Sequence, residues 1–99
     1  MKSVPLKVIE INEEAKLDYK NEIRIILSTP EDRQAGATID EMRSAIRVLD
    51  VLDALDENAD VMELEDADYS YLQGRVQNAR FGMVHPAIVQ FIDDISQIE

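Results

Sequence analysis

The chain has 99 residues, 45% of them hydrophobic and 31% charged, which suits one folded domain (1–99) and excludes a disordered acidic segment. Its 21 acidic and 10 basic residues give a formal net charge of −11, so nucleic-acid phosphates are repelled and we expect no direct DNA or RNA binding. It has no cysteine and no apolar run of the roughly 20 residues that cross a bilayer, which excludes disulfides, thiolate metal sites and a membrane span.

The acidic excess is concentrated in one third of the chain. Residues 35–68 carry 2 basic and 11 acidic side chains, a net charge of −9, whereas residues 1–34 and 69–99 each carry a net charge of −1. The N-terminal sequence MKSVPLKVIEI is interrupted by charge too early to resemble a secretory signal. With cysteine absent, we expect a protein of a reducing cytoplasm.

The first segment predicts a β-hairpin within residues 1–28. VPLKVIEI (4–11) is rich in β-branched residues, and Pro5 suits the start of a strand or an edge position. The polar stretch 12–21 serves as the connection. EIRIIL (22–27) then alternates, which places three aliphatic side chains on one face of a second strand.

A long helix is predicted at 38–58. Thr38 is followed three residues later by Glu41, the pattern of a capping box. Apolar residues recur at the three- and four-residue steps of a buried helix face. They are Met42, Ala45, Ile46, Leu49, Leu52 and Leu55, with Val48 widening the belt.

A short strand is predicted at 61–65, where it could join the hairpin, and a second helix at 66–81. Asp66 is the expected N-cap of this helix, and Asp68 lies near its positive end. We expect Gly82 to end the helical run. The apolar side of this helix is formed by Tyr69, Leu72, Val76, Ala79 and Met83.

A third helix is predicted at 86–97, because Pro86 fits the first helical turn. His85, the only histidine, precedes this proline and is read as an extended residue that could cap the helix rather than as a site. The inner face is expected to carry Ile88, Phe91, Ile92 and Ile95. The predicted fold class is therefore α+β: an N-terminal β-hairpin, with a third short strand as an option, packed against three helices.

The sequence contains no recognised catalytic arrangement. It has no GxSxG, no phosphate-cradling glycine motif, and no second histidine. ELEDAD (63–68) fails as a calcium loop, because the sixth and twelfth positions counted from Asp66 are Tyr71 and Gln77. We therefore predict a non-enzymatic protein with no catalytic residues, no cofactor and no metal. An enzyme that uses a divalent ion bound by scattered carboxylates is the weakest alternative.

Four acidic residues are candidates for binding a partner: Asp50, Asp53, Glu57 and Asp60. They follow a narrow arc of the long helix and its end, where like charges and the helix dipole both disfavour acids. The arc is either a face for a basic partner or a solvated surface that maintains solubility. Arg43 and Arg47 lie within reach of Asp40 and Asp50, so we expect local ion pairs there rather than ligand-binding residues.

Three further candidates for partner binding are Tyr71, Arg75 and Phe81. Tyr71 and Arg75 are predicted to face away from the apolar side of the second helix, and Tyr–Arg surfaces are common binding hot spots. The alternative for Tyr71 is a partly exposed ring lying against the sheet. Phe81 lies off the apolar side of its helix, which indicates a corner cap or a contact surface.

The segment ELEDADYSYLQGRV resembles a pattern found in small, mostly uncharacterised acidic proteins of tailed-phage and prophage genomes. The matching residues are Met62–Leu64 and Asp66–Leu72, which fit an LxLxDADYxxL-like turn; the order of elements is similar over 38–95. Some of those proteins lie among head and tail morphogenesis genes. The resemblance implies a protein that acts by binding another protein, and it transfers no catalytic residue.

These observations predict a non-enzymatic protein-interaction module, phage-encoded, that acts in virion morphogenesis or on a host protein. The expected partner is a phage structural or host protein, or the chain itself in a homo-oligomer, in the host cytoplasm or the virion. The alternative is an acidic nucleic-acid mimic that inhibits a protein with a basic groove, motivated by the carboxylates of residues 50–68.

Overall fold

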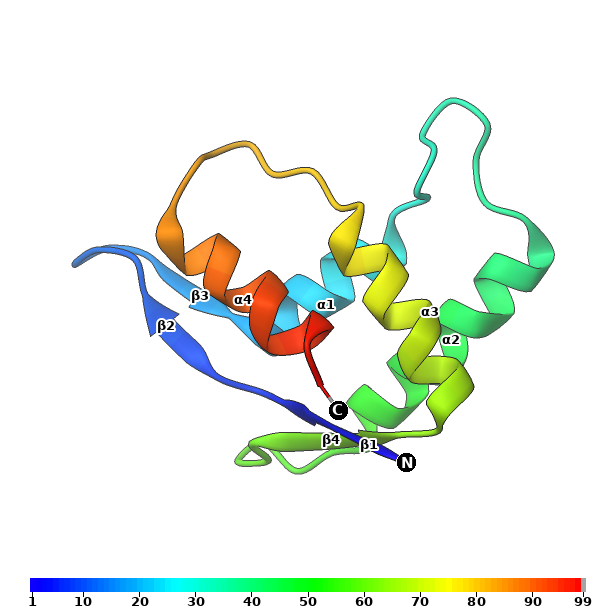
Figure 1. Ribbon diagram of the computed structural model, residues 1–99, viewed down its shortest axis with the longest axis horizontal. Helices are drawn as coiled ribbons and strands as arrows, with labels where there is room; N and C mark the ends of the chain where they lie inside the picture. The colour runs from blue at the N-terminus through cyan, green and yellow to red at the C-terminus, as the bar shows by residue number, and fades with distance from the viewer. Residues whose placement is uncertain (99) are drawn as a thin grey trace.

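The computed structural model describes residues 1–98, within which four helices stand beside two small antiparallel sheets (Figure 1). The predicted α+β class is confirmed. One sheet pairs β1 (Lys2–Pro5) with β4 (Val61–Leu64), and the other pairs β2 (Val8–Glu10) with β3 (Lys16–Asp18). The helices are α1 (Tyr19–Ser28), α2 (Ile39–Asp53), α3 (Asp66–Gln77) and α4 (Pro86–Ser96).

The β1–β4 sheet joins two segments that are far apart in the sequence. Val4 lies opposite Met62 in the register, and both side chains are fully buried. On the other face, the hydroxyl of Ser3 donates to a carboxylate oxygen of Glu63 at 2.6 Å. This alternation of buried and exposed positions confirms the predicted strand at 61–65, which pairs with β1 rather than with the β2–β3 hairpin.

The predicted hairpin over residues 1–28 is wrong in its second strand, because residues 22–27 belong to helix α1. The observed hairpin closes earlier, at a turn in which the Asn12 side chain accepts from the backbone N–H groups of Glu14 and Ala15. Asp18 then caps α1 by accepting from the N–H of Lys20 at 3.0 Å. The buried residues of α1 follow a helical spacing rather than alternation. They are Tyr19, Ile23, Ile26 and Leu27.

Helix α2 begins as predicted but ends early. The Thr38 side chain accepts from the N–H of Glu41 at 3.1 Å, which confirms Thr38 as the N-cap, and the last helical residue is Asp53 rather than residue 58. Helix α3 begins after Glu65, which occupies the N-cap position without a side-chain hydrogen bond. The prediction that Asp66 caps this helix is therefore wrong.

The end of α3 and the start of α4 frame a connection over residues 78–85. Helix α3 ends at Gln77, where the side chain of Asn78 donates back to the carbonyl of Gly74, so Gly82 lies in the connection and does not terminate the helix. The predicted cap of α4 is confirmed, because Nδ1 of His85 accepts from the N–H of Ala87 at 3.0 Å. Pro86 occupies the first turn, as expected.

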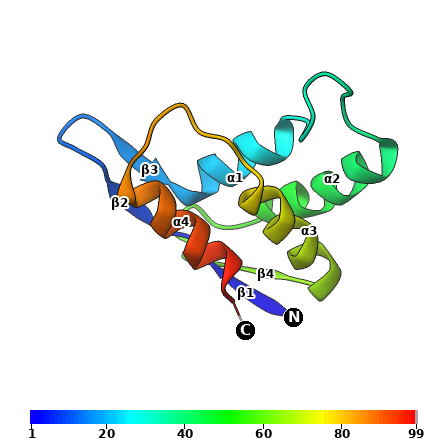
Figure 2. The ribbon, with the colours of Figure 1, turned by 45° about the horizontal axis from the view of Figure 1, so that its top comes forward.

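The hydrophobic core draws residues from all four helices and both sheets. At its centre, the rings of Tyr19 and Phe91 meet edge to face with centroids 4.8 Å apart, and both residues are fully buried. In Figures 1 and 2 the β2–β3 hairpin extends away from α2 and α3, while α2 lies at the opposite side of the molecule. Within residues 1–98, no helix is long and apolar enough to cross a membrane.

Candidate protein-interaction surfaces

The outer face of α2 carries three large apolar side chains that the fold leaves uncovered. Ile39, Met42 and Ile46 are 61%, 45% and 53% exposed, and their three- and four-residue spacing aligns them along the helix. The opposite side of α2 is buried through Ala45, Val48 and Leu52. We call Ile39, Met42 and Ile46 the apolar stripe.

The helical periodicity predicts that Met42 and Ile46 are buried, and this part of the prediction is wrong. The apolar arc of α2 is wider than the surface that packs against it, since α1, α3 and β4 contact the helix from one side only. Ala45, Val48 and Leu52 face these neighbours, and the stripe faces outward. Exposed apolar residues aligned on one helix face are typical of interaction sites.

Two of the four predicted acidic residues continue the line of the apolar stripe. Asp50 lies four residues after Ile46, and Asp53 lies seven residues after Ile46. The helical repeat therefore places both carboxylates on the same outer face as the stripe. Asp53 is bound by Arg24 of α1 at 2.8 Å, whereas Asp50 forms no ion pair with any residue of 1–98. We call the stripe together with Asp50 and Asp53 the α2 face.

Glu57 and Asp60 lie beyond the helix, in the connection to β4. Their side chains are exposed, and it is their backbone that supports the fold. The carbonyl of Glu57 accepts from Nζ of Lys20 at 3.1 Å, and the carbonyl of Asp60 accepts from the N–H of Leu6 at 2.8 Å. The predicted acidic arc is thus divided between a helix face and a connecting segment.

The local ion pairs predicted along α2 do not form. Arg47 reaches Asp68 of α3 at 2.9 Å instead of Asp50. Arg43 is exposed and forms no ion pair within the described part of the chain. Arg47 binds Asp68 because α3 packs beside α2 and brings the mostly buried carboxylate of Asp68 within reach.

A second surface is an open groove of about 810 Å³ between the C-terminal ends of α1 and α3 and the segments that follow them. This volume lies within the range of ligand pockets in proteins. Its apolar wall includes Ile25, Ala79 and Phe81. Three of the chain's 10 basic residues also line it: Arg33, Arg75 and Arg80. We call it the arginine groove.

Arg75 forms the floor of the arginine groove and is 8% exposed, which contradicts the prediction that it faces outward. Its guanidinium donates to the Tyr71 hydroxyl at 2.8 Å, to the Ile26 carbonyl at 2.6 Å, and to the Thr29 carbonyl. It therefore caps the C-terminus of α1, whose own last turn has no basic residue. Tyr71 and Arg75 are therefore in contact, but Arg75 stabilises the fold instead of facing outward.

The charge of the arginine groove is opposite to that of the molecule. Glu31 and Asp32 also line it, so three arginines face two carboxylates in a chain of net charge −11. Asp32 is occupied in shaping the loop, because its carboxylate accepts from the N–H groups of Gln34 and Ala35 at 2.9 and 3.1 Å. Phe81, the last of the predicted site residues, is half-buried in this groove.

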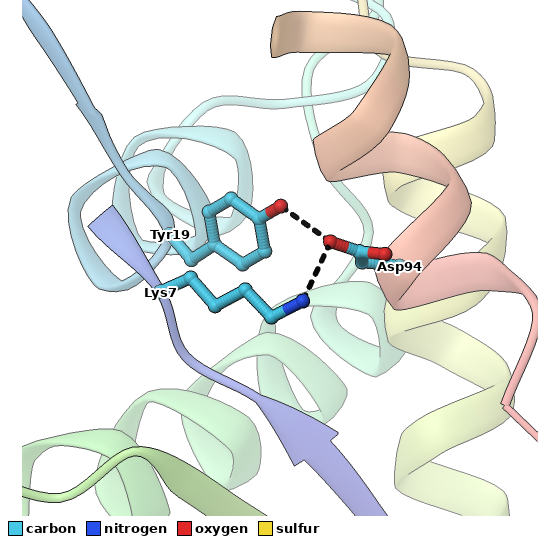
Figure 3. Close-up of polar contacts among 3 residues, drawn as sticks. All are labelled: Lys7, Tyr19 and Asp94. Carbon is cyan, nitrogen blue, oxygen red and sulfur yellow. Dashed lines mark hydrogen bonds and ion pairs between the residues drawn. The ribbon is translucent and has the colours of Figure 1, made fainter. Parts of the chain in front are cut away.

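A partly buried polar cluster joins three distant segments, and no local sequence pattern indicates it (Figure 3). The Tyr19 hydroxyl donates to Asp94 of α4 at 2.6 Å, and Nζ of Lys7 reaches the same carboxylate oxygen at 3.3 Å. Burial, and then the hydrogen bond and charge of Asp94, raise the pKa of Tyr19 well above its usual value. The phenol therefore keeps its proton, and the cluster tethers α4 to the strand connection and the start of α1.

Among residues 1–98, no group of three or more histidine or acidic side chains is arranged to hold a metal ion. No protein-family model matches the chain, and no curated protein or solved structure is significantly similar to it. The site must therefore be interpreted from its own chemistry, and the likeness to phage proteins stays a prediction.

Proposed function

We propose that this chain is a non-enzymatic protein-interaction module, phage-encoded, that acts in virion morphogenesis or on a host protein, within the host cytoplasm or the virion. The observation that carries the proposal is the apolar stripe of α2. Three large aliphatic or thioether side chains in line on one helix are exposed by 45% to 61%. Such a line is the pattern by which a helix enters an apolar groove of a partner.

The chemistry of the α2 face defines the partner surface that fits it. The stripe requires an apolar surface, and Asp50 requires a basic or hydrogen-bond-donating group one turn further along. The side chains best suited to acid–base chemistry support the same proposal, because they serve the fold. Tyr19 retains its proton beside Asp94, and Nδ1 of His85 is engaged in the cap of α4.

The proposal is tested by affinity capture from phage-infected cells of the native host, with three baits. The wild type and Val84→Glu are compared with Ile46→Glu; Val84 is fully exposed in the connection before α4, so it controls for added charge. A specific partner is expected with wild type and Val84→Glu, and its recovery falls about tenfold or more with Ile46→Glu. Equal recovery by all three baits contradicts the proposal.

The nucleic-acid mimic remains the second candidate, since Asp50, Glu57 and Asp60 are exposed and form no ion pair within residues 1–98. It differs from the first candidate in its response to salt. Binding through carboxylates is lost at about 0.5 M NaCl, whereas binding through the apolar stripe persists. If the mimic is correct, replacing Asp50, Asp53 and Glu57 together by their amides abolishes binding, whereas binding through the apolar stripe is only weakened by the loss of Asp50.

A further inference from the structure

Two surfaces of this chain have complementary composition. The α2 face combines apolar side chains with Asp50, and the arginine groove combines apolar side chains such as Ile25 and Phe81 with an excess of arginine. No residue of α2 lines the groove. In Figure 1 the ends of α1 and α3 that form the groove lie toward the top, and α2 runs along the right-hand side. The two surfaces are therefore formed by different residues.

We infer that the α2 face of one molecule docks in the arginine groove of a second copy of the chain. The inference rests on the proposed function, because it names the partner of the same helix face. Charge complementarity selects a second copy. The groove has a net positive lining in a chain of net charge −11, and the α2 face offers the Asp50 carboxylate, which forms no ion pair within residues 1–98.

The size of the groove is suited to the side chains of a helix face. From Ile39 to Asp50 the face extends about 16 Å, at about 1.5 Å per residue. A groove of about 810 Å³ accepts several side chains from such a face but not a whole helix, whose diameter is about 10 Å. The apolar stripe then packs against the wall that contains Ile25 and Phe81, and Asp50 lies among the arginines.

The arginines are available for this contact to different degrees. Arg75 uses three of its five N–H donors within the described residues, and no carboxylate among those residues neutralises it. Arg33 and Arg80 are exposed at the rim and form no ion pair there. A carboxylate entering the groove therefore meets a buried cation on the floor and two exposed ones at the edge.

A contact between two different surfaces repeats from copy to copy. Such a heterologous interface builds an open chain of molecules or a closed ring, rather than a two-fold dimer. The equal negative charge of the copies opposes assembly at long range. At about 0.15 M salt this repulsion is screened beyond about 8 Å, so the local contacts decide the outcome.

The test measures the weight-average mass of the full chain by sedimentation velocity, between about 10 µM and 1 mM at about 0.15 M salt. Arg80→Glu alters the groove and Asp50→Lys alters the α2 face. Lys16→Glu and Asp93→Lys are matched controls, because they make the same charge changes at exposed residues outside both surfaces. Far-UV circular dichroism verifies that all four variants, each changed at an exposed side chain, are folded.

Wild type and both controls are expected to exceed the mass of two chains at high concentration. Arg80→Glu and Asp50→Lys each weaken association about tenfold or more when alone. Mixed in equal amounts, they associate more strongly than either variant alone, because one retains an intact α2 face and the other an intact groove.

Three results overturn the inference: a wild type that is monomeric throughout, a mixture no heavier than its separate components, or an Arg80→Glu variant that associates as the wild type does. The last result would indicate a two-fold contact between α2 faces. A monomeric wild type that still captures a partner through Ile46 would refute the self-association alone and leave the proposed function intact.

Discussion

The guanidinium of Arg75 in α3 donates to the carbonyl oxygen of Ile26 in α1 at 2.6 Å, across 49 residues of sequence. This contact closes the C-terminal end of a helix that has no basic residue in its last turn. It also makes α3 a structural support for one wall of the arginine groove. The fold and the groove therefore depend on the same side chain, which has consequences for mutation.

Replacing Arg75 with Met keeps most of the side-chain volume but removes every donor. The carbonyls of Ile26 and Thr29 and the Tyr71 hydroxyl then lose their partner in a partly buried setting, so we expect a loss of about 2–3 kcal/mol in the free energy of unfolding. Urea denaturation measures it. Arg80→Met is the control, expected within about 0.5 kcal/mol of wild type because Arg80 is exposed. Equal losses for both variants would show that the cap contributes nothing.

Stability should fall in alkaline solution through Tyr19. Its folded-state pKa is raised, first by burial and then by Asp94, whereas the unfolded phenol titrates near 10.0. The contribution is fully present below pH 10 and is lost as the pH rises toward the folded pKa, because the unfolded chain then releases the proton first. Urea midpoints measured from about pH 8 to 11 should decline for wild type.

Tyr19→Phe isolates that contribution. We expect the variant to be about 1 kcal/mol less stable at neutral pH, because Asp94 loses a hydrogen bond while retaining Lys7, and to show a weaker alkaline decline. Spectroscopic titration offers an independent check. Tyr19 should resist ionisation until the protein unfolds. An unchanged alkaline decline in the variant would assign the effect to another group.

Much of the architecture can be predicted from the sequence, because these elements depend on local signals. The cap at Thr38, the proline start at Pro86 and the alternation in 61–65 each involve residues within a few positions of one another. The strand predicted at EIRIIL is wrong because its aliphatic residues fit both a two-residue and a 3.6-residue repeat. The available signal was Asp18, a good N-cap directly before Tyr19, Ile23 and Leu27.

The sites were less predictable, because their geometry depends on contacts between distant segments. Nothing local to Arg75 indicates that it caps α1, and nothing local to Asp94 indicates that Tyr19 and Lys7 converge on it. Likewise, periodicity shows how wide the apolar arc of α2 is, but not how much of it other elements cover. The stripe became visible only as the part of the arc that remains exposed.

The cap of α4 yields a graded prediction. His85→Ala removes the acceptor for the N–H of Ala87, and we expect a loss of about 0.5–1 kcal/mol. His85→Ser supplies a hydroxyl in the same role and should restore or exceed wild-type stability, because serine is among the best N-caps. Thermal unfolding of the three proteins tests the order. If His85→Ser is as unstable as His85→Ala, the histidine ring contributes through packing rather than through its nitrogen.

The two sides of α2 should respond oppositely to mutation. Leu52 is 3% exposed and lies on the packed side, so Leu52→Ala should cost about 2–5 kcal/mol through lost burial and a residual cavity. Ile46 is 53% exposed, and Ile46→Gln should change the unfolding free energy by less than about 0.5 kcal/mol. The same Ile46→Gln change should weaken self-association and partner capture. A large loss of stability from Ile46→Gln would mean that the stripe is part of the core, and the proposed interaction face would then have no independent basis.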